Sequence, residues 1–397
     1  MESSTSSKYQ PKTTNLLGNP VHHFVKPGLP DWAADEVSAE LLSKAAITFV
    51  QPQNIALFAD TGVLLAALAP KILSASFTVL STNLILANCA QQTLQANKIQ
   101  HCEQVTGYSL LPQHQNCFDL ILMPLPKGRR LARRWLLEAF YLLRPQGSLL
   151  LAGSNPMGIQ SVVRDGELLF GNFQVLAYKK GHRVARFVKQ TGIPDELEWV
   201  KTPGIAPSSW IQFSAPVYNK EFQIYSLPGI FSEDHLDEGS ALLIDSLDVS
   251  GYHYLLDAGC GYGILGLAAV ERSRLNNQPV EVDLVDIDFA ALAACQKTMQ
   301  VHEISNAAVF ASDLYSQIGK RQYDLIFSNP PFHTGKRVNY TVARALITQA
   351  YQALRTGGRL MLVANRFIRY EKIIQEIFHN YKICAQNNHF HVISAEK

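Results

Sequence analysis

Two separate parts of the chain carry the same pattern of residues, and this repetition restricts the possible folds more than any other feature. Residues 118–126 read FDLILMPLP, and residues 323–331 read YDLIFSNPP. Residues 141–152 read YLLRPQGSLLLA, and residues 352–363 read QALRTGGRLMLV. The matching segments keep their order and lie about 205 to 211 residues apart. Ordered matches at a nearly constant spacing predict that the chain contains one structural unit twice.

The second half of the chain alternates between short apolar runs and longer segments with helical periodicity. We expect strands at residues 254–257, 282–286, 324–327 and 359–364, and helices at residues 264–270, 289–301 and 342–354. Such alternation is typical of a parallel sheet with helices on both faces. Residues 55–62 of the first half match the first of these strands and its turn. The prediction is therefore an α/β fold with two tandem Rossmann-like domains.

The domain borders follow from length and local composition. A chain of 397 residues exceeds one ordinary domain. The N-terminus is polar and rich in Ser and Thr, and we expect a disordered tail over residues 1–18. Two prolines, a glycine and two serines within residues 201–209 predict a linker over residues 201–214. The two predicted domains then span residues 19–200 and 215–397.

Charge and cysteine content exclude several classes of protein. The net charge of +2 gives no overall attraction to nucleic acid, so any such site must come from local basic patches. The six cysteines form no C-x-x-C pair and no Cys/His cluster, so we expect reduced thiols and no metal site. No apolar run reaches the length of about 18 residues that a membrane span needs. These observations favour a cytoplasmic protein without a membrane partner.

A glycine-rich turn follows the strand expected at residues 254–257. Residues 257–263 read DAGCGYG and lead into the next helix. Gly259, Gly261 and Gly263 permit a tight turn and a close approach of the backbone to a ligand. Dinucleotide-binding enzymes use similar turns, so the glycines alone do not identify the ligand.

Acidic residues follow the strands at three points of the same predicted sheet edge. Asp257 begins the glycine turn, where a carboxylate can bind the amino group of a methionine-like moiety. Asp286 ends the second strand, where a carboxylate can accept both ribose hydroxyls. Asp313 follows the next strand region and can accept a hydrogen bond from an adenine amino group. Together with the motif described next, this order favours S-adenosylmethionine over a nicotinamide dinucleotide.

The sharpest motif is Ser-Asn-Pro-Pro-Phe at residues 328–332. It follows a strand, and ligands of parallel sheets bind at the strands' carboxyl ends. A nucleobase amino nitrogen is a poor nucleophile because its lone pair is delocalised into the ring. The Asn329 side-chain oxygen and the Pro330 carbonyl can accept its two N–H groups, and Phe332 can stack on the base. We therefore predict methyl transfer to an exocyclic amine, driven by positioning and electrostatics.

These residues resemble the class I methyltransferases with an N-P-P-[FYW] motif. More narrowly, the second half is similar to the bacterial ribosomal RNA guanine-N2 methyltransferases of the RsmC and RlmG kind. The matching stretches are residues 228–232, 236–239, 257–263, 329–333 and 363–366. The resemblance implies a methyltransferase that acts on guanine N2 of ribosomal RNA. It also implies two methyltransferase-like halves, of which the first has lost cofactor binding.

Two other hypotheses remain open at this point. N-P-P-F also occurs in enzymes that methylate adenine N6 in RNA or DNA. An RNA-binding assembly factor with a vestigial methyltransferase fold is the third possibility, and the set of Asp257, Asp286 and Asn329 argues against it. The sequence departs from the family at Glu233, where a basic residue is expected after Phe-Ser.

The first half lacks the groups needed for catalysis but is rich in basic residues. It has MPLP at residues 123–126 in place of the Asn-Pro-Pro motif, and it has no G-x-G-x-G turn. We therefore interpret it as a degenerate copy that docks RNA or stabilises the second domain. The expected partner is ribosomal RNA or a ribosomal subunit, and we expect the protein to be a monomer. A solvated charged face is the alternative. The basic residues expected to hold phosphates are Lys127, Arg129, Arg130, Arg133, Arg134, Lys179, Lys180 and Arg183 in the first half, and Lys336 and Arg337 beside the motif.

Overall fold

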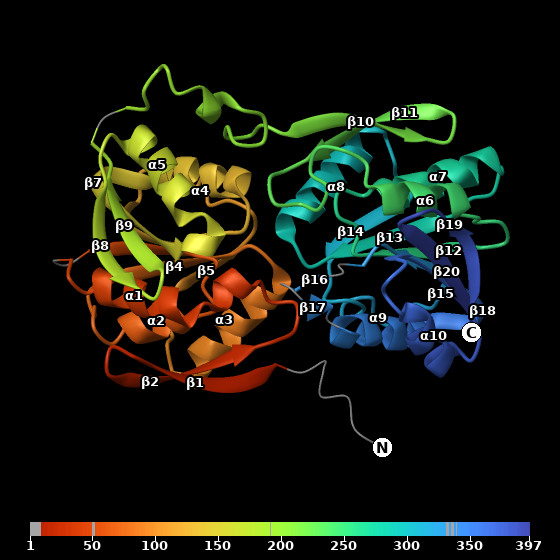
Figure 1. Cartoon of the computed structure of the whole chain (residues 1–397), viewed down its shortest axis with the longest axis horizontal. Helices are drawn as coiled ribbons and strands as arrows, with labels where there is room; N and C mark the ends of the chain where they lie inside the picture. Colours follow the sequence, from red (N-terminus) through yellow and green to blue (C-terminus); the bar gives the residue numbers. More distant parts are fainter. Residues whose placement is uncertain (1–8, 50–51, 191, 331–332, 335–336, 339) are drawn as a thin grey trace. The chain divides into compact units, whose positions relative to one another are not determined.

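The chain forms two compact units. The computed structural model describes residues 9–49, 52–190, 192–330, 333–334, 337–338 and 340–397. Contacts divide the described chain into a first unit within Lys8–Trp210 and a second within Ile211–Lys397. Each unit contains one seven-stranded sheet (Figure 1). None of the described helices is long and apolar enough to cross a membrane.

The sheet of the second unit has the strand order β14-β13-β12-β15-β18-β20-β19. Its strands are β12 (Tyr254–Ala258), β13 (Glu281–Asp286), β14 (Ala307–Ala311), β15 (Tyr323–Ser328), β18 (Leu354–Asn365), β19 (Lys382–Gln386) and β20 (Phe390–Glu396). The first five run parallel to one another, and β20 runs antiparallel to both of its neighbours. The apolar strands and their pairing place the carboxyl ends of β12 to β15 along one edge.

Helices cover both faces of this sheet (Figure 1). They are α6 (Glu238–Ser246), α7 (Ile264–Leu275), α8 (Phe289–Val301), α9 (Tyr340–Ala353) and α10 (Tyr370–Phe378). The core beneath α9 and α10 is apolar, with Ile347 and Ile374 packed in one cluster with Ile326 and Leu360 of the strands. A hairpin of β10 (Ile211–Val217) and β11 (Lys220–Ser226) precedes the sheet, and β16 (His333–Thr334) pairs with β17 (Arg337–Val338).

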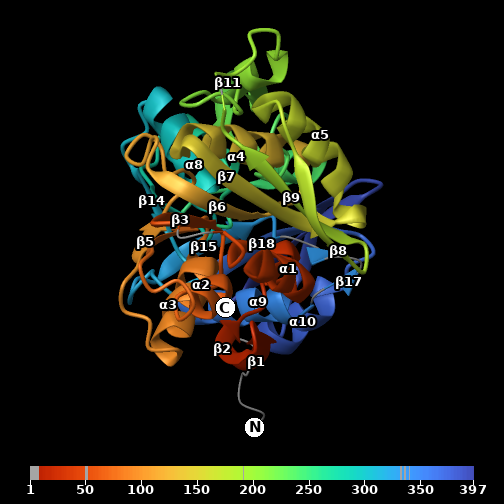
Figure 2. The ribbon, with the colours of Figure 1, turned by 90° about the vertical axis from the view of Figure 1, so that its left-hand side faces the viewer.

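The first unit repeats this arrangement, with the strand order β5-β4-β3-β6-β7-β9-β8. Its strands are β1 (Gln10–Leu16), β2 (Asn19–Val25), β3 (Asn54–Phe58), β4 (Ser76–Ser81), β5 (Glu103–Thr106), β6 (Phe118–Pro124), β7 (Leu143–Ser154), β8 (Gln174–Lys179) and β9 (His182–Val188). Its helices are α1 (Glu36–Ala46), α2 (Val63–Leu68), α3 (Leu84–Ala96), α4 (Arg129–Leu142) and α5 (Ile159–Phe170). Figure 2 shows α4 and α5 on one face of the sheet and α1 to α3 on the other. The predicted pair of Rossmann-like domains is thus confirmed.

Each sheet departs from the predicted parallel arrangement at one end. In the second unit β19 and β20 are joined by a short turn, and a short turn can join only antiparallel strands. β20 then inserts between β19 and β18. β8 and β9 do the same in the first unit. Both sheets are therefore mixed.

The structure also differs from the tail and the linker that composition suggested. Residues 10–16 of the expected tail form β1, which pairs with β2, and Leu16 and Val21 pack against α2. The expected linker is not an open connection either. Ile205 is buried, and residues 211–214 already belong to β10. Polar and Pro-rich composition did not reveal these contacts because only a few apolar side chains make them.

Candidate cofactor and substrate site

The carboxyl edge of the second sheet brings together the residues that the sequence analysis selected there. The glycine turn follows β12, Asp286 ends β13, Asp313 follows β14, and Asn329 follows β15. The register pairs β12 with both β13 and β15, so the first two features and Asn329 lie on adjacent strands. Ligands of parallel α/β sheets bind at this edge.

The glycine turn has a backbone that other residues adopt with difficulty. Gly259 and Gly263 have φ of +80° and +89°, and the N–H of Gly259 donates to the Val285 carbonyl at 2.8 Å. A Cβ at Gly263 would lie 2.6 Å from Cys295 Sγ on α8. The glycine turn is thus packed against both β13 and α8, and it places the start of α7 at the edge of the sheet.

Asp257 lies beneath this turn, which differs from the predicted ligand contact. The residue is 0% exposed, and its Oδ2 accepts the Gly266 N–H at 3.0 Å. Its Oδ1 is buried without a hydrogen-bond partner among the described residues. Burial, opposed by the Gly266 hydrogen bond and assisted by Asp286, raises the pKa of Asp257 to about 8. None of the surface of this carboxyl is exposed, and its hydrogen bond to Gly266 ties the end of β12 to the start of α7.

Asp286 links the end of β13 to the glycine turn. Its Oδ2 accepts the Gly261 N–H at 2.9 Å, and its Oδ1 accepts the Asp288 N–H at 3.0 Å. The side chain is partly exposed, and burial raises its pKa. Each carboxylate oxygen has a second lone pair, so the group can still accept hydroxyl groups of a ligand.

The sequence analysis overlooked Asp288, a fourth acid at this edge. It is the N-cap of α8 and accepts the N–H groups of Ala290 and Ala291 at 2.7 and 3.2 Å. Burial, followed by repulsion from Asp286, raises its pKa to about 7. An aspartate directly before a helical segment is a capping signal that could have identified it. Asp313 is partly exposed after β14, and its N–H donates to Ser316 Oγ at 3.2 Å.

The side chain of Asn329 is oriented by residues of α6 and its cap. Asn329 Nδ2 lies 3.0 Å from Asp237 Oδ2 and 2.8 Å from Ser240 Oγ. Asn329 Oδ1 is buried and has no hydrogen-bond partner among the described residues. Leaving a buried acceptor unpaired is costly, so this atom is suited to accept a donor from a ligand. Pro330 is buried after it.

Several selected residues lie outside the described part of the site. Phe332 and Lys336 are not among the described residues, and of Arg337 only the backbone is described, in β17. An aromatic side chain that the sequence analysis did not select is Phe231, which is 63% exposed in the loop that leads to Asp237. Phe231 belongs to the matching stretch 228–232, but its exposure is a property that the sequence does not contain.

The basic run of the first unit is only partly available to a ligand. Arg134 is 7% exposed and donates to the Gly204 carbonyl, so its prediction as a phosphate-binding residue is wrong. Arg129 and Arg133 both form paired hydrogen bonds with Asp165, a buried acid from α5. The helix turns Arg134 inward, which the run of charges alone did not indicate.

The other predicted phosphate contacts of the first unit differ in their partners. Lys127 and Lys180 are exposed, and Arg130 is partly exposed. Lys179 forms an ion pair with Glu40 at 2.6 Å. Arg183 donates to Asn155 Oδ1 at 3.1 Å.

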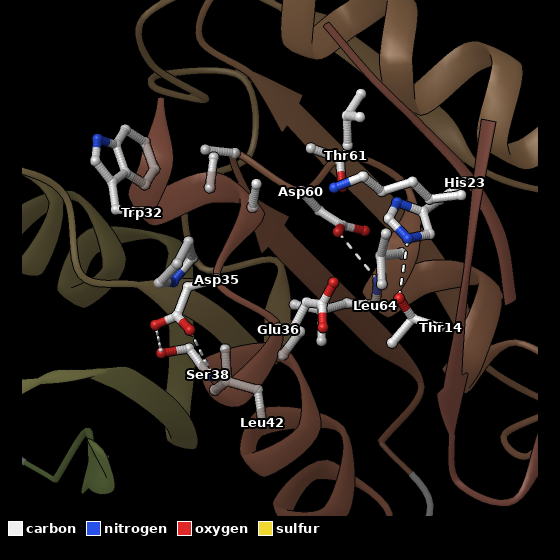
Figure 3. A pocket seen from close by; sticks show the side chains of 18 residues that line it. Thr14, His23, Trp32, Asp35, Glu36, Ser38, Leu42, Asp60, Thr61 and Leu64 are labelled. Carbon is white, nitrogen blue, oxygen red and sulfur yellow. Dashed lines mark hydrogen bonds between the residues drawn. The ribbon is translucent and has the colours of Figure 1, made fainter. Parts of the chain in front are cut away.

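The first unit has a hollow of about 640 Å³ at its own sheet edge, including the part open to solvent. Figure 3 shows Asp60 in this hollow, with its carboxylate hydrogen-bonded to the start of α2. Asp60 accepts the N–H groups of Leu64 and Leu65 at 3.1 and 3.0 Å. Pro124 lines the same hollow at the position that matches Asn329. The Asp60 carboxylate thus accepts the N–H groups at the start of α2. The position that matches Asn329 holds a proline, which has no carboxamide to accept a hydrogen bond.

The arrangement of the second unit defines a class of protein. A doubly wound sheet with a glycine turn, an acid after β13 and Asn-Pro-Pro after β15 is that of a class I S-adenosylmethionine-dependent methyltransferase. The model of the methyltransferase small domain family matches residues 34–186 and 221–394, one region in each unit. The chain belongs to this family.

Similar proteins carry more specific names. The "Ribosomal RNA small subunit methyltransferase C" of Psychromonas ingrahamii (strain DSM 17664 / CCUG 51855 / 37) is 33% identical over 286 residues, which cover 71% of this chain and 77% of that protein. The protein of the same name from Pseudomonas putida (strain W619) is 32% identical, with coverages of 70% and 80%. A solved structure described as "T. Thermophilus 16S rRNA N2 G1207 methyltransferase (RsmC) in complex with AdoMet and Guanosine" is 28% identical, with a TM-score of 0.79 and 98% of both chains covered.

Proposed function

We propose that this chain transfers a methyl group from S-adenosylmethionine to the exocyclic N2 of a guanine in small-subunit ribosomal RNA. The observation that carries this proposal is the buried Oδ1 of Asn329 at the carboxyl end of β15, which has no hydrogen-bond partner in the described part of the chain. The relatives named for ribosomal RNA methylation support the substrate class, and the similar structure named for N2 methylation supports the guanine nitrogen.

The residues of the second unit fit the cofactor. The glycine turn and the partly exposed Asp286 carboxylate form a cradle in which Asp286 would accept the ribose hydroxyls. Asp313, two strands from the glycine turn, would accept the adenine amino group. When bound, the cofactor supplies a methyl group on a sulfonium sulfur.

The acceptors of the Asn-Pro-Pro motif would activate the amine by geometry. Asn329 Oδ1 accepts one N–H of the guanine amine, and the Pro330 carbonyl accepts the other. This arrangement turns the nitrogen lone pair out of conjugation with the ring and toward the methyl carbon. Transfer would form the new N–C bond at the expense of the C–S bond, and the extra proton on nitrogen would pass to water. Phe332 or the exposed Phe231 would stack on the base, which must leave its helix or lie in a loop.

The first unit would contribute RNA binding. Lys127, Arg129, Arg130 and Arg133 lie at the start of α4 or just before it, and Asp165 neutralises part of their charge. Lys179, Lys180 and Arg183 lie in or beside the hairpin of β8 and β9. Cations of this kind position RNA through its phosphates. We infer that the chain acts as a monomer, since Asp286, Asp313 and Asn329 all come from one unit of one chain. We also infer that it acts in the cytoplasm.

The direct test uses small ribosomal subunits from a strain that lacks this protein. The full chain and labelled S-adenosylmethionine are added, and the ribosomal RNA is digested and analysed by mass spectrometry. We expect one N2-methylguanosine per subunit, and none with the Asn329→Ala variant. Label in N6-methyladenosine would reassign the substrate to adenine, and cofactor binding without any RNA label would favour an assembly factor.

A further inference from the structure

The carboxamide of Asn329 is held by two side chains from one neighbouring helix start. Its Nδ2 donates to Asp237 Oδ2 at 3.0 Å and to Ser240 Oγ at 2.8 Å. Asp237 is the N-cap of α6, and the same Oδ2 accepts the Ser240 N–H at 2.9 Å. Both donor hydrogens of the carboxamide are therefore engaged by this cap, while its Oδ1 has no partner among the described residues.

The chemistry of the two partners fixes which way the carboxamide faces. Half a turn about its last bond would exchange Oδ1 and Nδ2. A serine hydroxyl tolerates either orientation because it can donate or accept. An ionised carboxylate only accepts, so Asp237 admits only the orientation with Nδ2 toward it. Asp237 therefore decides that the oxygen, and not the nitrogen, is presented on the other side.

We propose that Asp237, assisted by Ser240, is a positioning residue for methyl transfer that locks the Asn329 carboxamide with its acceptor oxygen toward the substrate amine. This inference rests on the proposed function, because it concerns the same acceptor. In the reversed orientation Nδ2 would face the substrate amine, donor against donor. The hydrogen bond that directs the amine's lone pair would then be lost.

The first unit contains the same cap without an asparagine beside it. Asp35 is the N-cap of α1, and Ser38 stands three residues later, as in the cap of α6. Pro124 lies at the position of the asparagine. Here the Ser38 hydroxyl donates to Asp35 Oδ2 at 2.7 Å, as Figure 3 shows, and Asp35 Oδ1 accepts the N–H groups of Val37 and Ser38. The Asp35 cap also has a partner from a distant strand, because His182 Nε2 of β9 lies 3.0 Å from Asp35 Oδ2. The cap of the second unit thus differs in that its distant partner is the carboxamide of Asn329, which follows β15.

This duplication supplies a matched control for the experiment. Asp237→Ala and Asp35→Ala each remove a helix N-cap together with one contact from outside the helix, to Asn329 and to His182 respectively, so both should lower stability by a similar amount. Only Asp237→Ala releases the carboxamide. We expect it to lower kcat about ten- to hundredfold, as loss of a fixed geometry at a reacting group does, with the Kd for S-adenosylmethionine unchanged within about twofold. Asp35→Ala should keep the kcat of the parent protein.

A conservative variant separates positioning from charge. In Asp237→Asn an amide oxygen at the place of Oδ2 still accepts the N–H groups of Asn329 and Ser240. Most of the kcat should therefore be retained. All measurements use the full chain with small ribosomal subunits, and kcat and the KM for the subunits are determined separately, because a released carboxamide should change kcat more than KM.

A reciprocal exchange provides a second readout that keeps a polar side chain at both positions. Asn329→Asp places a second carboxylate next to Asp237, and like charges at this distance repel. Combining it with Asp237→Asn removes this repulsion, because only one of the two side chains then carries a charge. The double variant should therefore be faster than Asn329→Asp alone. A purely structural role would make the two losses additive.

A parent-like kcat for Asp237→Ala, an equal loss in Asp35→Ala, or additive losses in the reciprocal exchange would overturn the positioning role. If Asp237→Ala no longer binds S-adenosylmethionine, the reciprocal exchange decides, since both of its positions keep a polar side chain. A parent protein that forms no N2-methylguanosine contradicts the proposed function instead, and that result is read from the parent alone.

Discussion

Replacing Asp257 by asparagine tests whether this acid holds the glycine turn or binds the ligand. The substitution keeps an acceptor for the Gly266 N–H and removes a carboxyl whose pKa is raised to about 8 by burial. In the unfolded chain an aspartate titrates near 4. The folded parent therefore binds a proton between about pH 4 and pH 8 that the unfolded chain does not bind.

The sign of the effect follows from this difference. A carboxyl with a raised pKa in the folded state contributes stability that is present at low pH and is lost as the pH rises toward 8. Within the window this single proton lowers the free energy of unfolding by at most about 1.4 kcal/mol per pH unit. The Asp257→Asn variant lacks this term. Its stability should fall less steeply with pH, and its advantage over the parent should be largest near pH 8.

The assay is urea unfolding of the full chain at pH 5.5, 6.5 and 7.5. The transition of the second unit is identified as the one that S-adenosylmethionine shifts to higher urea concentration. Cofactor affinity, measured by calorimetry at pH 7, should change by less than about threefold. Parallel pH profiles of parent and variant would refute the burial argument. A loss of cofactor affinity of tenfold or more, the scale of a charge-assisted hydrogen bond, would show that Asp257 binds the cofactor.

Three further predictions concern other parts of the chain. Asn329→Ala should leave cofactor affinity nearly unchanged and lower turnover at least about a hundredfold, as loss of a preorganised polar group does, and single-turnover kinetics will measure it. Lys127→Ala combined with Arg130→Ala should weaken RNA binding and reduce its salt dependence, measured by filter binding at two salt concentrations, while cofactor binding stays unchanged. Equal salt slopes for the parent and the double variant would contradict a role of these residues in RNA docking. Gly263→Ala should lower the melting temperature of the second unit and weaken cofactor binding, because a Cβ there meets Cys295 Sγ at 2.6 Å and φ is +89°, and a parent-like melting temperature would contradict the packing argument.

The sequence predicted those features that depend on neighbours along the chain. The helix expected at residues 289–301 is α8 (Phe289–Val301), and β12, β13 and β15 lie where short apolar runs indicated strands. Strands of a parallel sheet end at a common edge, so the residues that follow them could be grouped without coordinates. The duplication was visible for the same reason, since an equal order of elements leaves an equal order of motifs.

Contacts between distant segments were decided by the tertiary structure alone. Asp237 lies 92 residues before Asn329, and no local pattern links a helix cap to a strand end. The burial of Arg134 depends on a segment that folds back to place the Gly204 carbonyl beside it. The antiparallel insertion of β20 likewise depends on which edge of the sheet the last hairpin joins. The physical reason is that local periodicity specifies an element and its buried face, whereas the partner of a polar group is fixed only when the packed chain excludes water from it.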